Sequence, residues 1–218
     1  MELIDWQFAL EILPRLLGGL VVTVEATLVG FVLAVVLGLF LALARRSENP
    51  WLSQPVGAVV EFIRGTPLLV QLFFFFFVLP RYGLRLPAFL VGTLALGLHY
   101  ATYTSEVYRA GIDAIDRGQW EAATALNFSP LRIWVGVILP QAIPPMIPAL
   151  GNYLIGMFKE SAQLLAITVT ELMLTARVIG TETFRFLEPI TLAGLLYFLI
   201  SYPSALLVQR LEARYARR

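Results

Sequence analysis

The sequence predicts an all-α membrane protein with about five transmembrane helices. Of its 218 residues, 58% are hydrophobic and only 14% are charged, and the mean hydropathy is +0.77. A water-soluble domain does not carry this much apolar surface, and long uncharged runs are typical of membrane spans. We expect residues 1–218 to form a single transmembrane domain.

Composition also narrows the chemistry of the chain. A net charge of +1 without a basic stripe argues against a nucleic-acid partner. The absence of cysteine excludes thiol catalysis and zinc–thiolate sites. Lys159 is the one lysine, and no Gly-Lys-Ser/Thr phosphate-binding loop surrounds it. We therefore expect no enzyme activity, metal site or cofactor in this chain. The acidic start, with Glu2 and Asp5, does not resemble a cleavable targeting peptide.

The first predicted span covers Leu16–Ala44 and ends at Arg45 and Arg46. Small residues recur on it every four positions, at Gly30, Ala34, Gly38 and Ala42. Such a stripe lets two helix backbones approach closely in lipid, so we assign it to helix packing. The residues from Ser47 to Pro55 are expected to form a short polar turn.

The second span covers about residues 56–80 and is interrupted by Glu61 and by Arg64-Gly65-Thr66-Pro67. Thr66 followed by Pro67 is typical of an N-cap and a first-turn proline, so the helix is expected to break and restart there. The aromatic run Phe73–Phe77 must mostly face lipid or neighbouring helices, because one helix face cannot hold five consecutive residues. A tight loop follows over residues 80–87.

The third span, Ala88–Arg109, is unusually polar. His99, Tyr103 and Glu106 share one helical face by their spacing. Polar groups at membrane depth generally face the bundle interior or an aqueous cavity. A satisfied network between helices and a contact with a solute remain equally open explanations for this face.

The fourth span is expected to be broken by prolines and to restart after them, continuing to Phe158; the prolines are Pro140, Pro144, Pro145 and Pro148. Lys159-Glu160-Ser161 then places charge inside an apolar region, either around water or as a local Lys159–Glu160 ion pair. Residues 171–188 are expected to form a polar loop before a fifth span, Pro189–Gln209.

A polar segment at about residues 111–139 separates the third and fourth spans. Residues 120–126 favour a helix, and Asn127 tolerates the left-handed conformation that ends many helices. Ser129-Pro130 is typical of the start of a second short helix. The segment predicts a helix–turn–helix outside the lipid that exposes alanine, which suits docking as well as a simple connector between spans.

Six residues of this segment resemble the "EAA" loop of permease subunits of ATP-binding-cassette (ABC) importers: Glu121, Ala122, Ala123, Ile138, Leu139 and Pro140. Asn127 stands where that family has glycine. Arg64-Gly65-Thr66-Pro67 and Lys159-Glu160-Ser161 are similar to motifs of polar amino-acid-type permeases. The stretches 61–71, 99–103 and 121–127 resemble ectoine and hydroxyectoine importers most closely.

The resemblance implies a type I ABC importer permease fold in the bacterial cytoplasmic (inner) membrane. It also implies a dimer of cytoplasmic ABC ATPases that hold ATP and Mg, a second permease subunit (self or sister) and an extracytoplasmic solute-binding protein. The residues expected to couple to the ATPase are Glu121, Ala122, Ala123 and Asn127.

Arginine placement predicts the orientation. Ten arginines fall on one predicted side: Arg45, Arg46, Arg64, Arg109, Arg117, Arg132, Arg210, Arg214, Arg217 and Arg218. Five fall on the other: Arg15, Arg81, Arg85, Arg177 and Arg185. The positive-inside rule then places the C-terminus and the Glu-Ala-Ala segment in the cytoplasm and the N-terminus outside.

A path for a polar amino acid or a compatible solute such as ectoine is expected near mid-membrane. Its candidate residues are His99, Tyr103, Glu106, Lys159, Glu160 and Ser161, with Gln71 and Glu61 as further candidates. The alternative function is a small ion-coupled secondary transporter, although such proteins are usually larger and built from inverted repeats, which the hydropathy does not show. The spans contain no motif of an intramembrane enzyme.

Overall fold

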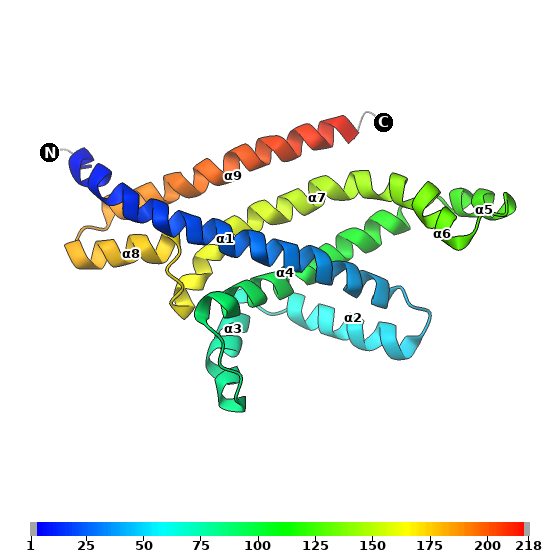
Figure 1. The fold of residues 1–218 in the computed structure, drawn as a ribbon, viewed down its shortest axis with the longest axis horizontal. Coiled ribbons are helices and arrows are strands. Elements are labelled where there is room, and N and C mark those ends of the chain that lie inside the picture. The colour runs from blue at the N-terminus through cyan, green and yellow to red at the C-terminus, as the bar shows by residue number, and fades with distance from the viewer. Residues whose placement is uncertain (1–3, 216–218) are drawn as a thin grey trace.

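The computed structural model describes residues 4–215, and every regular element in that range is helical. Figure 1 shows these elements in chain order. The α-helices are α1 (Trp6–Arg45), α2 (Pro50–Arg64), α3 (Leu68–Phe73), α4 (Ala88–Asp113), α5 (Arg117–Ala125), α6 (Pro130–Ile133), α7 (Leu139–Glu160), α8 (Leu172–Thr183) and α9 (Leu187–Tyr215). Shorter turns join them: the π-helical turns η1 (Phe74–Val78) and η3 (Trp134–Ile138), and the 3₁₀ turns η2 (Leu79–Tyr82) and η4 (Ser161–Ile167).

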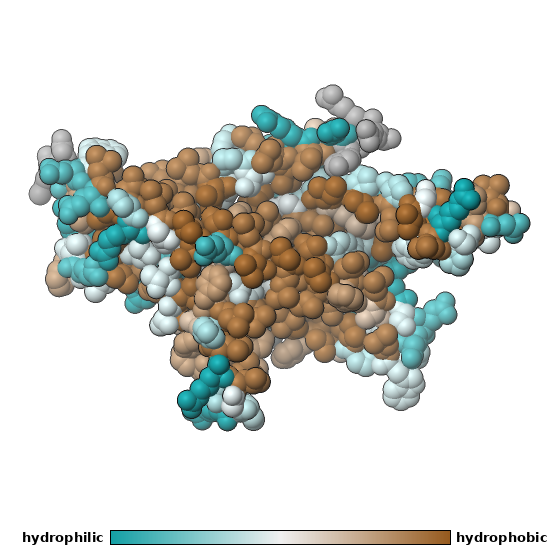
Figure 2. Space-filling model, in the orientation of Figure 1, coloured by the Kyte–Doolittle hydropathy of each residue, from teal (hydrophilic) through white to brown (hydrophobic). Residues whose placement is uncertain are grey.

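The helices form an elongated bundle. Figure 1 shows the start of α1 and α8 at one end, which we call the α8 end, and α5 with α6 at the other, the α5 end. Figure 2 shows apolar side chains across the middle and polar ones gathered towards the two ends. Helix α9 runs from the α8 end towards the α5 end, so the described chain starts and finishes towards opposite ends of the bundle.

The five predicted spans correspond to α1, the α2–α3 pair, α4, α7 and α9. Three helical segments are long and apolar enough to cross a membrane: Trp6–Arg45, Pro130–Ile167 and Leu187–Arg214. The bent pair Pro50–Arg64 and Leu68–Tyr82 makes a fourth if it counts as one span. Helix α4 has 26 residues but carries the polar face, and it remains a predicted span.

Close packing of α1 against α4 forms the centre of the bundle. All four residues of the predicted stripe on α1 are buried. A Cβ atom added at Gly38 would lie 1.9 Å from Thr104 Oγ1 on α4, and one added at Gly97 would lie 3.0 Å from the Gly30 carbonyl oxygen. The Thr104 hydroxyl donates to the Ala34 carbonyl at 2.7 Å. The stripe therefore brings the two backbones together, as predicted.

The polar turn after α1 is shorter than predicted. Asn49 caps α2, its side chain accepting from the Trp51 amide at 3.0 Å, and Pro55 lies inside the helix. Pro50 at the first helical position costs little, because the amide there has no partner within the helix, whereas Pro55 removes one hydrogen bond, a loss that the helix tolerates. The predicted turn from Ser47 to Pro55 is therefore wrong beyond Asn49.

The predicted break in the second span is confirmed: α2 and α3 meet at an angle of 103°. The predicted N-cap is wrong, because Pro67 itself occupies the N-cap position of α3, and its side chain has no oxygen that could accept from a backbone amide. The Thr66 hydroxyl instead donates back to the Ile63 carbonyl at 3.1 Å, closing the end of α2.

The predicted interruption at the prolines is also wrong. Helix α7 is continuous from Leu139 to Glu160 and contains Pro144, Pro145 and Pro148. Each proline removes one amide donor, but the surrounding hydrogen bonds persist, and Figure 1 shows the helix curving along its length. The charged residues 159–161 coincide with a helix end, since α7 ends at Glu160 and η4 begins at Ser161.

The predicted polar loop at residues 171–188 contains α8 instead. Glu171 caps this helix, its carboxylate accepting from the Met173 amide at 2.8 Å and the Leu174 amide at 2.7 Å. Leu172, Ala176 and Ile179 are buried against α1 and α9. Their spacing of four and three places them on one helical face, and burial of this face outweighs the polarity of the rest of the segment.

At the α5 end, α5 and α6 form the predicted helix–turn–helix. Asn127 has φ 56°, as predicted. The Phe128 amide donates to the Ala123 carbonyl at 3.2 Å and the Asn127 amide to the Thr124 carbonyl at 2.9 Å, which is the Schellman pattern of a left-handed helix end. Ser129 occupies the N-cap position of α6, as predicted, although its side chain makes no capping bond.

We expect Gly38→Ala to lower the free energy of unfolding by ~1–3 kcal/mol, because the new methyl group overlaps Thr104. Gly18→Ala on the same helix is the matched control, since a Cβ there meets no atom within 4 Å. Denaturant titrations of the purified variants measure the difference. An equal loss of unfolding free energy in both variants would show that the contact between α1 and α4 does not limit stability.

We expect Asn127→Gly to be tolerated and Asn127→Val to destabilise the turn by roughly 1–2 kcal/mol, because a branched side chain resists the left-handed conformation. Amide hydrogen exchange at residues 127 and 128 reports the opening of the two Schellman bonds. Wild-type protection in the valine variant would contradict the steric explanation.

Candidate functional site

A polar cavity lies where the α2–α3 break meets α4 and the junction of α7 with η4. Its volume is about 430 Å³. Its walls are formed by Arg64, Gly65, Thr66, Pro67, Leu68, His99, Tyr103, Glu160 and Gln163. Three of the predicted solute-path residues, His99, Tyr103 and Glu160, are therefore brought together.

The backbone of the break is held in place by Gln71. Its side-chain amide donates to the Ile63 carbonyl at 2.8 Å, to the Thr66 carbonyl at 3.1 Å and to the Thr66 hydroxyl at 2.9 Å. Its carbonyl oxygen lies 3.3 Å from His99 Nδ1. Gln71 is thus buried behind the cavity wall, where it satisfies the peptide groups freed by the break and orients His99.

Aromatic rings form one side of the cavity. The Tyr103 ring centroid lies 5.2 Å from that of His99 and 5.7 Å from that of Tyr153. The Arg64 guanidinium carbon lies 5.3 Å from the Tyr103 centroid, within the range of a cation–π contact. This contact places the Arg64 charge at the cavity wall, whereas the arginine distribution had counted it among the charges that flank a span.

Two groups of opposite charge in the cavity wall are incompletely satisfied. Arg64 Nε and Glu160 Oε2 are buried, and neither has a hydrogen-bond partner among residues 4–215. The remaining contact of the Arg64 guanidinium is weak, with Nη1 3.4 Å from the exposed Glu61 carboxylate. Unpaired charged atoms away from water are costly unless a ligand or water satisfies them.

Glu106 and Glu61 do not line this cavity. They belong to an ion-pair cluster nearer the α5 end, which joins the ends of α1 and α4 to the last turn of α2. The Arg45 side chain contacts Glu106 and lies 3.8 Å from Glu61, and Arg109 contacts both Glu106, at 2.9 Å, and Asp113, at 3.0 Å. Helical spacing correctly aligned Glu106 with His99 and Tyr103, but it lies one turn beyond the cavity.

Lys159 and Ser161 are also outside the cavity. The Lys159 side chain is exposed, and the structure records no Lys159–Glu160 ion pair between residues 4 and 215. Ser161 is fully buried and its hydroxyl donates to the Phe158 carbonyl at 2.7 Å. Ser161 therefore closes the end of α7, while Glu160 alone of the three faces the cavity.

The sequence arguments missed Arg64 and Gln163 as cavity residues. Arg64 was visible as part of the predicted break, and a charged residue at a helix end inside a span is itself a signal of a polar cavity. Gln163 lies in the 3₁₀ turn η4, whose course could not be derived from the apolar residues around it.

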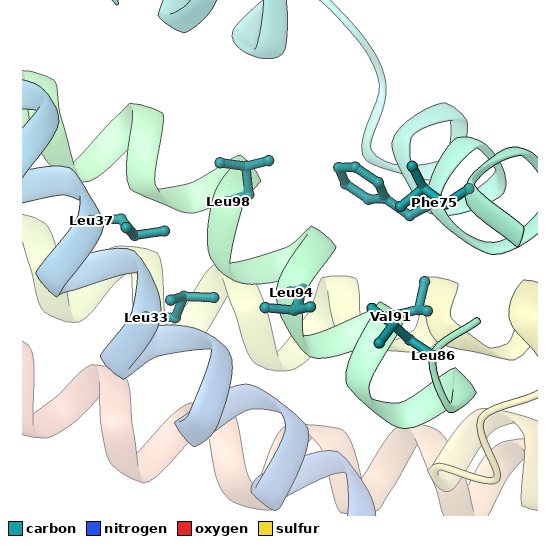
Figure 3. Close-up of a pocket in the computed structure, with 8 residues that line it drawn as sticks. Leu33, Leu37, Phe75, Leu86, Val91, Leu94 and Leu98 are labelled. Carbon is teal, nitrogen blue, oxygen red and sulfur yellow. The ribbon is translucent and has the colours of Figure 1, made fainter. Parts of the chain in front are cut away.

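A second cavity shows the contrast in chemistry. It encloses about 270 Å³ between α1, α4 and η1, and Figure 3 shows its leucine, valine and phenylalanine side chains. None of these side chains offers a hydrogen bond or a charge, so this cavity cannot replace the hydration of an ionic solute.

The tip formed by α5 and α6 projects from the bundle. Glu121 and Ala122 are exposed, and so are Leu126 (68%) and Leu131 (74%). Ala123 is buried, contrary to the expected exposure of this alanine. Helix α5 of the tip is joined to α7 by a hydrogen bond of 3.1 Å from Gln141 to Gln119, and to η3 by the edge-to-face pair Trp120–Trp134.

Comparison with known proteins identifies relatives over nearly the whole chain. A probable amino-acid ABC transporter permease of Sinorhizobium fredii is 46% identical over 97% of this chain and 91% of the relative. An arginine transport system permease of Bacillus subtilis is 36% identical over 90% of each chain. A putative glutamine transport system permease of Rickettsia conorii is 32% identical over 89% of this chain and 91% of the relative.

Solved structures agree with these relatives. The crystal structure of an amino acid ABC transporter with histidines has a chain 36% identical to this one, with a TM-score of 0.91 over 98% of this chain and all of that chain. A methionine ABC transporter in inward-facing conformations, 21% identical, shares the fold with a TM-score of 0.65 over 95% of this chain and 99% of its own. The fold is that of type I ABC importer permeases. Residues 34–217 match the binding-protein-dependent transport system inner membrane component, and the chain belongs to that family.

Proposed function

We propose that this chain is the permease subunit of a bacterial ABC importer for a zwitterionic amino acid or an amino-acid-derived compatible solute such as ectoine. It spans the inner membrane several times and pairs with itself or a sister subunit. An extracytoplasmic binding protein delivers the solute, and two cytoplasmic ATPase subunits holding ATP and Mg²⁺ drive transport. The family and the relatives named as amino-acid, glutamine and arginine permeases support this proposal.

The observation that supports a zwitterionic solute is the pair of opposite charges in the polar cavity. Arg64 and Glu160 both line it, and the buried Arg64 Nε and Glu160 Oε2 lack a hydrogen-bond partner within the described part of the chain. A zwitterion satisfies both: its carboxylate accepts from Arg64, and its ammonium or amidinium group donates to Glu160. The face of Tyr103 is available to cover a delocalised cation such as the ectoine ring.

The size of the cavity is compatible with such a solute. Small-molecule sites generally enclose about 300–1,000 Å³, and this cavity, at 430 Å³, falls at the lower end of that range. His99 and Gln163 add further polar groups to the cavity wall. These groups can replace water around the solute without adding net charge to the membrane interior.

Orientation follows from the arginine distribution. Arg64 no longer counts as a flanking charge, and Arg217 and Arg218 lie outside the described residues. The remaining arginines are still more numerous on the side of the α5 end, which favours this end as cytoplasmic and the N-terminus as outside. The α5–α6 tip then faces the compartment that contains ATP.

We assign coupling to this tip through Glu121, Ala122, Ala123 and Asn127. Exposed Ala122 permits close approach of a partner surface, and exposed Leu126 and Leu131 offer apolar contact area. Ala123 is buried within the tip, and Asn127, in its left-handed conformation, forms the turn between α5 and α6. The ion-coupled secondary transporter is not favoured, because family members work with a binding protein.

We expect Glu160→Gln and Arg64→Lys each to raise the KM for transported solute by roughly tenfold to a hundredfold, the value of a hydrogen bond to a charged group. Transport into vesicles containing the complete importer measures KM, with glutamine, arginine and ectoine as competing solutes. Glu11→Gln, which neutralises an exposed carboxylate outside the cavity, serves as the control. Unchanged KM for every solute would refute the assignment of the cavity, whatever happens to assembly.

We expect Glu121→Lys to reduce solute-stimulated ATP hydrolysis by roughly tenfold or more, because reversing a charge in an interface costs several kcal/mol. Glu48→Lys makes the same charge change at an exposed position between α1 and α2 and should preserve activity. Both variants are compared in the assembled importer. Normal coupling in the Glu121 variant would exclude the tip as the transmission site.

A further inference from the structure

A third cavity, which we call the α9 groove, lies between α1, α7 and α9. It encloses about 410 Å³. Its lining comes from all three helices: Phe31, Val35, Ile147, Leu150, Gly151, Leu154, Ser204, Leu207, Val208 and Leu211. The single hydroxyl, that of Ser204, donates to the Ile200 carbonyl at 2.8 Å. The groove therefore presents hydrocarbon to its occupant.

Contact between α7 and α9 shapes the groove. A Cβ atom added at Gly151 would lie 2.5 Å from Val208 Cγ2, so the two helices touch at this point. Leu207 and Leu211 flank the contact on α9 and are both exposed. The groove is thus open along its length to the surroundings of the bundle.

Two arginines stand at the end of the groove. Leu207, Arg210, Leu211 and Arg214 follow the spacing i, i+3, i+4 and i+7, which places them on one helical face. Arg210 and Arg214 are exposed, and neither forms an ion pair with the part of the chain that the structure describes. Because the predicted span ends at Gln209, these charges lie where the hydrocarbon of a bilayer gives way to its headgroups.

We propose that the α9 groove binds one anionic phospholipid of the surrounding bilayer. An acyl chain occupies the hydrocarbon groove, and the headgroup phosphate accepts hydrogen bonds from Arg210 and Arg214. Acyl burial alone would not select among lipids, whereas guanidinium groups at the headgroup level favour a net negative charge. This site is separate from the polar cavity and does not depend on the proposed solute.

Native mass spectrometry of the purified full chain tests the proposal. Phosphatidylglycerol and phosphatidylcholine with identical acyl chains are titrated, and we expect the anionic lipid to bind at least several times more tightly. Arg210→Gln with Arg214→Gln should weaken phosphatidylglycerol binding by roughly fivefold per arginine. Arg81→Gln with Arg85→Gln removes the same charge from the loop before α4 and should leave binding unchanged.

Equal affinity for the two lipids, or equal losses in the two double variants, would overturn the proposal. A Leu150→Trp variant, which fills the groove with the arginines intact, should also lose phosphatidylglycerol; full retention would overturn the placement of the acyl chain. Since the chain has no cysteine, Leu207→Cys introduces a single thiol. Disulfide formation between copies in native membranes would show that a second copy, and not lipid, covers the groove.

Discussion

Backbone contact between α1 and α4 is the constraint on which the rest of the bundle depends. Where Gly38 meets Thr104 and Gly30 meets Gly97, no larger side chain fits between the helices. In lipid this proximity supplies the attraction itself, through dispersion and through the hydrogen bond from Thr104 to Ala34, because apolar burial gives little driving force there. With these faces fixed together, α1 packs its remaining surface against α8 and α9, and α4 turns its polar face towards the α2–α3 break.

That break places charge at the cavity, while the Gln71 side chain satisfies two backbone carbonyls at the break. Interrupting a span frees backbone donors and acceptors, which is tolerated only where protein or water can satisfy them. The Gln71 side-chain amide donates to the carbonyls of Ile63 and Thr66, and its carbonyl oxygen lies within hydrogen-bond distance of His99. Arg64 therefore ends α2 at the cavity, opposite Glu160 at the end of α7. Two helix ends, together with His99 and Tyr103 on the polar face of α4, create the site.

Hydropathy and local end signals predicted most helices, because Arg45, Asn127 and Glu160 each mark a physical boundary. They failed at α8, where only the spacing of Leu172, Ala176 and Ile179 indicated a helix, and along α7, whose prolines bend the helix instead of ending it. For the site, helical spacing predicts which face of α4 a residue lies on, but not where along the helix the cavity ends. It therefore grouped Glu106 with Tyr103, although Glu106 belongs to the ion-pair cluster. The position of Arg64 depended on the angle of the break, which local sequence does not encode.

The polar cavity and the α5–α6 tip are built on the same two helices. Helix α4 carries His99 and Tyr103 and ends just before α5, whereas α7 begins just after η3 and ends at Glu160. Near the tip the two helices are in tight contact, since a Cβ atom at Gly111 would lie 2.4 Å from Met146 Cε. Trp120 and Trp134 pack against this contact and leave little free volume. A packed interior shifts between discrete arrangements more readily than it deforms, so the coupling that we propose would carry a displacement of the tip along α4 and α7 together to the cavity.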